Sequence, residues 1–169
     1  MKGANLDDRK GRKATGTNEM GVSLYQLAVH LLRECDAGIK MGVQSIEDSL
    51  KYTSNGELKR TLEKNLAGHV EIQEKLQGLL NSYHDSGKEP PAMAKGMAWL
   101  KTNFKLAAES SDDAVADFIT DGCNMGVKSL SGYLNNYKAA DEKSKNIAKE
   151  LICLEERLSV DMRGYLSAK

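Results

Sequence analysis

Apolar residues recur at steps of three and four along four long stretches of this chain, and this pattern constrains its fold more than any other feature. Such steps place apolar side chains on one face of an α-helix, whereas a half-buried strand needs strict alternation, which is absent from the sequence. The only two prolines, Pro90 and Pro91, stand side by side in the clearest break along the chain. The sequence therefore predicts an all-α fold with two helices on each side of this break.

The bounds of the four predicted helices follow from short polar interruptions. The first helix is expected at about residues 22–52 and the second at about residues 57–83, with the turn TSNGE between them. The third begins after ESSDD, with Ser110 or Ser111 as its N-cap, and the fourth follows the polar break NNYKAAD. Because short connections join antiparallel neighbours, we expect a four-helix bundle of two antiparallel hairpins joined by a long crossover.

The crossover and the N-terminal tail complete the predicted organisation. The crossover, about residues 84–110, is long enough to travel the length of a bundle, and its apolar spacing predicts a short amphipathic helix packed on that bundle. A partner-binding helix is the alternative. The residues that define this spacing are Met93, Met97, Leu100 and Phe104. Residues 1–20 are polar and carry five basic side chains, which predicts a flexible, solvated tail, with a basic docking arm as the alternative. Residues 21–169 are then a single domain.

Composition and charge exclude several classes of partner. The chain has 24 basic and 24 acidic side chains, so its overall charge does not favour nucleic acid. Its apolar runs are far shorter than the ~20 residues that span a bilayer, and its first residues lack the apolar segment of a secretory signal. Three cysteines without a CxxC pair do not form a disulfide framework. We therefore expect a cytoplasmic protein without a membrane or nucleic-acid partner.

One phrase occurs twice in the chain. MGVQSI at residues 41–46 returns as MGVKSL at residues 125–130, 84 positions later (125 minus 41). The glycine of each copy is the second of two glycines that stand four residues apart. A glycine inside a helix lowers the stability of that helix by about 1 kcal/mol relative to alanine. The glycines are Gly38 and Gly42 in the first helix and Gly122 and Gly126 in the third. We therefore expect that closer packing at each glycine pair offsets this loss of helix stability.

A four-residue spacing puts both missing side chains on one helix face, where they form a shallow notch. Counting back from each turn places His69 opposite Gly38 and Leu154 opposite Gly122. The prediction is a duplicated helical hairpin in which a large side chain enters each notch. The alternative is that the glycine faces form a surface for association with another protein.

Two longer segments resemble a known superfamily. ECDAGIKMGVQSIEDSLKYTSNGELKRTLEKNLAGHVEIQEKL is similar to the first hairpin of small bacterial ferritin-like proteins, and DGCNMGVKSLSGYLNNYKAADEKSKNIAKELICLEERLSVDMRGYL resembles the second. The resemblance covers about residues 22–166 and implies a ferritin-like four-helix bundle. Active members of this superfamily hold two metal ions by a Glu from each of two helices and a Glu-x-x-His from each of the other two. The resemblance therefore indicates where metal ligands would stand in this chain.

This chain departs from that ligand pattern. Leu66 stands three residues before His69, and the fourth predicted helix has no histidine. Phe118 stands in the third helix at the place that matches Glu34 of the first. One candidate metal site is left, with Glu34, His69 and His30 as its ligands, since two histidines and a carboxylate suit iron, zinc or manganese. A core histidine that is hydrogen-bonded within the bundle is the alternative for His69.

The sequence contains no motif that identifies an enzyme. Phosphate-binding and dinucleotide-binding glycine loops are absent, and so is a nucleophile elbow. We predict no catalytic residue and no cofactor-binding residue. The expected function is that of a non-catalytic bundle that forms homo-oligomers or binds a protein partner. Metal binding by the three candidate ligands is the alternative, and a carrier of a small ligand or haem in the bundle interior is the third hypothesis.

Overall fold

The computed structural model describes residues 22–87 and 111–168, and four α-helices contain most of them. Among these residues there is no strand, which confirms the all-α prediction. The predicted tail (residues 1–20) and the predicted crossover helix (Met93 to Phe104) lie outside the described residues. The helices are α1 (Leu24–Leu50), α2 (Gly56–Ser82), α4 (Asp112–Asn136) and α5 (Glu142–Met162), followed by a 3-10 turn at Arg163–Tyr165. The bounds of α1 and α2 differ from the predicted ones by at most two residues.

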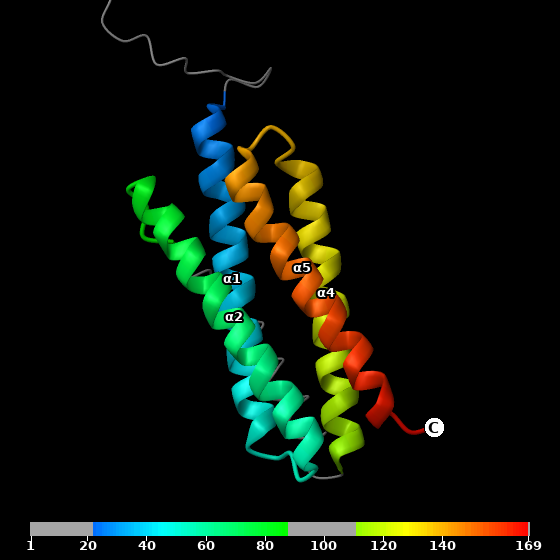
Figure 1. Cartoon of the computed structure of the whole chain (residues 1–169). Helices are drawn as coiled ribbons and strands as arrows, with labels where there is room; N and C mark the ends of the chain where they lie inside the picture. The colour runs from blue at the N-terminus through cyan, green and yellow to red at the C-terminus, as the bar shows by residue number, and fades with distance from the viewer. Residues whose placement is uncertain (1–21, 88–110, 169) are drawn as a thin grey trace, which may run out of the picture.

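The helices form a bundle of two layers (Figure 1). Helices α1 and α4 contact each other in one layer, α2 and α5 contact each other in the second, and α1 also contacts α2 and α5. Helices α1 and α5 run in one direction along the bundle, and α2 and α4 run in the opposite direction (Figure 1). None of the described helices has the length and apolarity needed to cross a membrane.

Hydrogen bonds tie the helix ends together at both ends of the bundle. At one end the Asp112 carboxylate, at the start of α4, accepts from the backbone N–H groups of Ser54 and Asn55 at 2.7 and 3.0 Å. At the other end the Tyr25 hydroxyl donates to the carbonyl of Tyr83. The start of α4 therefore lies beside the turn between α1 and α2, whereas α2 ends beside the start of α1.

Each α-helix begins at a polar side chain that accepts hydrogen bonds from the first turn. These N-caps are Ser23, Asn55, Ser111 and Asp141. They satisfy backbone N–H groups that have no partner inside the helix, which is why Ser, Asn and Asp favour this position. Of the two serines predicted to start the third helix, Ser111 is the cap. The polar breaks in the sequence therefore correspond to real helix starts.

The hydrophobic core consists of two clusters that are separated by a polar layer. One cluster includes Leu31, Leu76 and Leu151, and the other includes Leu62 and Leu158. On every helix the residues of the two clusters leave a gap near the middle of the bundle. The buried polar side chains Asn65, His69 and Glu155 occupy this level, and we call them the polar layer. The candidate site lies beside this layer.

Candidate functional site

The two glycine pairs predicted to form notches line one cavity. It has a volume of about 260 Å³ and lies between α1 and α4, with His69 and Glu155 of the polar layer at its floor. Gly38 and Gly42 border it from α1, and Gly122 and Gly126 border it from α4. The rest of its wall is mainly apolar and includes Met41, Ile46, Phe118, Ile119, Met125, Leu130 and Leu158. The two copies of the phrase, which were predicted to form separate notches, therefore share a single space.

One glycine of each pair makes room for a side chain of the polar layer. A Cβ atom at Gly42 would lie 2.9 Å from Nε2 of His69, and a Cβ atom at Gly126 would lie 1.9 Å from Oε2 of Glu155. Both distances are too short for a real contact, so a larger residue there would displace the buried side chain. Gly38 and Gly122 differ, because a Cβ atom at either position would meet nothing within 4 Å. These two glycines leave the cavity open.

The predicted contacts of the glycines, His69 with Gly38 and Leu154 with Gly122, were wrong. His69 enters next to Gly42 rather than Gly38, and Leu154 packs against Gly68 of α2 rather than against Gly122. Counting residues from the turns assumes parallel helix axes, but the helices are tilted against one another (Figure 1). Glu155 faces Gly126 of α4, and its neighbour Leu154 faces Gly68 of α2, because adjacent residues of a helix point in different directions.

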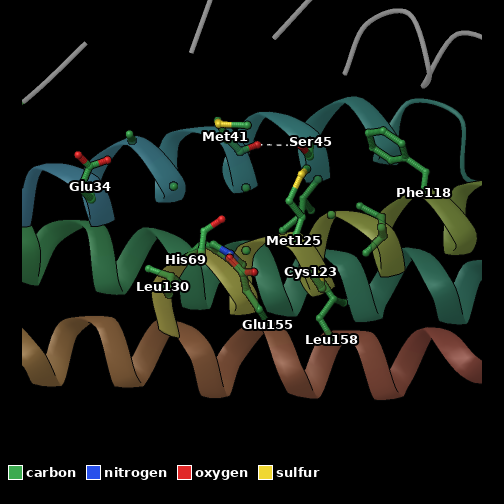
Figure 2. Close-up of a pocket in the computed structure, with 18 of the residues that line it drawn as sticks. Glu34, Met41, Ser45, His69, Phe118, Cys123, Met125, Leu130, Glu155 and Leu158 are labelled. Carbon is green, nitrogen blue, oxygen red and sulfur yellow. Dashed lines mark hydrogen bonds and ion pairs between the residues drawn. The ribbon is translucent and has the colours of Figure 1, made fainter. Parts of the chain in front are cut away.

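The floor of the cavity is a histidine and a carboxyl group that face each other. Figure 2 shows His69 of α2 and Glu155 of α5 pointing toward one another beneath the glycine-lined space. His69 is only 1% exposed and Glu155 only 6%. Nε2 of His69 and Oε1 of Glu155 are 3.9 Å apart, which is longer than a hydrogen bond.

Hydrogen bonding at the floor is incomplete. Nδ1 of His69 lies 3.1 Å from the carbonyl oxygen of Asn65, which can only accept, so Nδ1 carries a proton. In the neutral ring Nε2 is then an acceptor. Oε2 of Glu155 has no hydrogen-bond partner among the described residues. A buried polar atom without a partner costs about 1–3 kcal/mol, so a ligand that supplied a hydrogen bond here would be stabilised.

Burial controls the ionisation of the groups in and around the cavity. It raises the pKa of Glu155, and the neighbouring His69 offsets only part of this shift. Burial, together with the charge of Glu155, raises the pKa of Cys123 to about 12. Burial raises the pKa of Cys35 to about 12 as well, with a smaller contribution from Glu34. Both thiols are therefore protonated at neutral pH, unlike the low-pKa thiol of a cysteine nucleophile.

The three predicted metal ligands do not come together as a group. Glu34 and His69 both line the cavity, but Glu34 lies toward one end, away from the His69–Glu155 pair (Figure 2). There Glu34 interacts with Tyr133. Burial raises the pKa of Tyr133 most, and the charge of Glu34 and its hydrogen bond to Tyr133 raise it further. His30 is exposed and stacks on Tyr137, with ring centroids 6.2 Å apart, and it does not line the cavity.

The ligand set of a ferritin-like two-metal centre does not fit the described residues. Within residues 22–87 and 111–168, no group of three or more His, Cys, Asp or Glu side chains is placed to hold a metal ion. Binding of a single metal ion by Glu34, His69 and His30 stays a prediction.

Glu155 is the residue that the sequence-based prediction missed. It stands four residues after Leu151 and three before Leu158, so it shares the buried face of α5 with these leucines. A charged residue in step with buried leucines is the pattern that would have identified it. Apolar periodicity alone favours the adjacent Leu154 and passes over the carboxyl group.

No protein-family model, curated protein or solved structure matches this chain significantly. The ferritin-like resemblance therefore stays an expectation from the sequence. The cavity and its polar floor carry the functional conclusion.

Proposed function

We propose that this protein binds a small molecule with an apolar body and a single polar group in the cavity between α1 and α4. The observation that carries this proposal is Oε2 of Glu155, a buried atom without a hydrogen-bond partner among the described residues, at the floor of an apolar cavity. Ligand sites have this composition: mostly apolar walls and a few placed polar groups that orient the ligand. The protein holds the ligand by burial of its apolar part and by a hydrogen bond to the floor.

The size of the cavity indicates the size of the ligand. A dry apolar cavity of about 150 Å³ is known to hold benzene in another protein. The cavity here, at about 260 Å³, is large enough for a ring with a short substituent. The matched glycines support the same function, because replacing Gly38 and Gly122 by alanine would improve helix propensity but would narrow the open space.

Benzyl alcohol is a suitable first probe, because it combines one ring with one hydroxyl group. Isothermal titration calorimetry of the full chain is expected to show one binding site. Gly122→Leu is expected to abolish this binding, because the new side chain fills the cavity. Gly132→Leu is the matched control, since Gly132 is also a glycine of α4 with nothing within 4 Å but does not line the cavity.

Two results contradict the proposal. One is a wild-type protein that binds no benzyl alcohol and shows no rise in melting temperature with it, because any ligand of the native state raises that temperature. The other is equal binding by Gly122→Leu and Gly132→Leu, which would place the ligand elsewhere.

We also propose that the bundle has the ferritin-like arrangement of two antiparallel hairpins and a crossover. Two observations support this arrangement. Helices α1 and α2 run in opposite directions, as do α4 and α5 (Figure 1). In addition, α2 ends at the end of the bundle opposite to the start of α4, as a long connection between the two hairpins requires. An experimental structure that includes residues 83–111 tests this arrangement.

Self-association and metal binding, which the sequence predicted as functions, stay predictions. The proposed ligand site requires neither of them. Light scattering of the purified protein tests the first, and the content of iron, zinc and manganese per chain, in the wild type and in His69→Ala, tests the second.

A further inference from the structure

The ionisable groups that line the cavity are mainly acidic. Among the described residues of its lining there are two carboxyl groups, Glu34 and Glu155, and one histidine, His69, but no lysine or arginine. Carboxyl groups without a lysine or arginine among these described lining residues favour a positively charged ligand over a neutral or negative one.

The basic side chains of α1 that are close in sequence to the glycines are paired with carboxylates outside the cavity. Nζ of Lys40 lies 3.1 Å from Oδ2 of Asp36. The Arg33 guanidinium donates to Asp85 at 2.6 and 3.0 Å. Neither side chain lines the cavity, and neither supplies a counter-charge to Glu155.

The floor of the cavity offers acceptors for an ammonium group. Such a group carries only donors, and Oε2 of Glu155 and Nε2 of His69 are both able to accept. The walls suit the rest of such a ligand, because they are mainly apolar and can bury its uncharged body. A hydroxyl ligand would satisfy one acceptor, whereas an ammonium also neutralises a buried carboxylate.

From these observations we infer that the ligand of this cavity is a small organic cation, an ammonium group on an apolar body, whose charged group contacts Glu155. This inference rests on the proposed function and specifies its ligand class. The apolar body lies against the glycine-lined walls, and the ammonium lies on the floor.

Proton release follows from this arrangement. Burial favours the neutral carboxyl group of Glu155 in the free protein. The other described titratable groups that line the same cavity, from α1, α2 and α4, are Glu34, His69, Cys123 and Tyr133. An ammonium beside Glu155 favours the carboxylate instead. Binding then converts a neutral carboxyl and an ammonium into an ion pair and transfers one proton to the buffer. This release is expected at pH values where free Glu155 is protonated.

Three probes of similar size separate the effect of charge from that of size: benzylammonium, benzyl alcohol and benzoate. Titration calorimetry on the full chain is expected to show benzylammonium binding at least about tenfold more tightly than benzyl alcohol, because hydrogen bonds to charged groups are the stronger class. Benzoate is expected to bind most weakly. The preference for benzylammonium is expected to disappear in Glu155→Gln and to persist in Glu150→Gln, which changes an exposed carboxylate of the same helix.

The outcomes distinguish failure of this inference from failure of the proposed function. If benzyl alcohol binds and benzylammonium binds no better, the cation inference is wrong and the ligand site stands. If benzyl alcohol does not bind, the proposed function itself is wrong, whatever the other two probes do. If Glu155→Gln retains the full preference, Glu155 is not the contact for the charged group. The comparison of three probes on the wild-type protein needs no variant to fold.

Calorimetry in two buffers of different ionisation enthalpy provides a second readout. For benzylammonium the observed enthalpy is expected to depend on the buffer at acidic pH, as release of a proton requires, and this dependence is expected to vanish in Glu155→Gln. Buffer-independent enthalpies for the wild type at acidic pH would overturn the assignment of the charged group to Glu155.

Discussion

At Gly42 and Gly126 a buried polar side chain occupies the space that a side chain on the helix would otherwise take. His69 fills the first position and Glu155 fills the second. Each of these glycines is therefore required by the packing of a side chain from a different helix. Gly38 and Gly122 have no such neighbour, and what they preserve is open space. The repeated phrase thus combines two physical roles at a spacing of one helical turn.

Alanine substitutions separate these two roles. Gly42→Ala and Gly126→Ala are expected to lower the free energy of unfolding by about 1–3 kcal/mol, because the new methyl group displaces His69 or Glu155. Gly38→Ala is the control and is expected to raise it by up to about 1 kcal/mol through helix propensity. Urea unfolding followed by circular dichroism measures all three. Equal effects at Gly38 and Gly42 would show that the close approach of His69 has no energetic weight.

The raised pKa of Glu155 makes stability depend on pH in a defined direction. The folded protein keeps this proton at pH values where the unfolded chain, in which a glutamate has its ordinary pKa of 4.5, has lost it. Because the folded state then binds more protons than the unfolded state, the contribution of Glu155 to stability falls as pH rises from about 4.5 through the raised pKa. Glu155→Gln lacks this loss.

The difference in stability between Glu155→Gln and the wild type is therefore expected to shift in favour of the variant as pH rises across this window. Urea midpoints measured from about pH 4 to about pH 8 test this trend. Glu150→Gln serves as the control for removal of a carboxylate from α5. A difference that stays constant with pH, or one that shifts toward the wild type, would contradict the raised pKa.

At the scale of single elements, local chemistry determines where each helix begins. Apolar periodicity and polar breaks predicted the four helices, and Ser111 was correctly among the predicted caps. These features depend on residues within one or two turns of each other, which is why the sequence is sufficient. The level at which His69 meets α1 depends on how the helices tilt, and a local pattern does not contain that information.

The N-caps of α4 and α5 are expected to differ in strength. Asp141 accepts from the backbone N–H of Ser144 at 3.0 Å and from the Tyr83 hydroxyl at 2.7 Å, so it also ties α5 to the end of α2. Ser111 makes a longer bond of 3.4 Å to the backbone N–H of Ala114. Asp141→Ala is therefore expected to destabilise the protein by about 1 kcal/mol more than Ser111→Ala, given typical values for caps and single hydrogen bonds. Equal losses in chemical denaturation would contradict this ranking.

At the scale of the whole molecule, the cavity exists because all four helices meet at one level. Helices α1 and α4 provide the glycine walls, and α2 and α5 provide His69 and Glu155. The sequence predicted the all-α class, the four helices and the burial of His69. Glu155 escaped prediction because its partner is more than 80 residues away in the chain (155 minus 69), and the joint cavity escaped it because each glycine pair was assigned to its own hairpin.

Nuclear magnetic resonance titration of ¹⁵N-labelled protein with benzyl alcohol locates the ligand, because glycine amides give well-separated resonances at the positions that define the cavity. We expect the amide signals of Gly38, Gly42, Gly122 and Gly126 to move together and to fit one dissociation constant. Gly56 and Gly132, which do not line the cavity, are expected to keep their positions. Shifts at Gly56 or Gly132 without shifts at the four cavity glycines, or no shift at any glycine, would contradict a ligand site between α1 and α4.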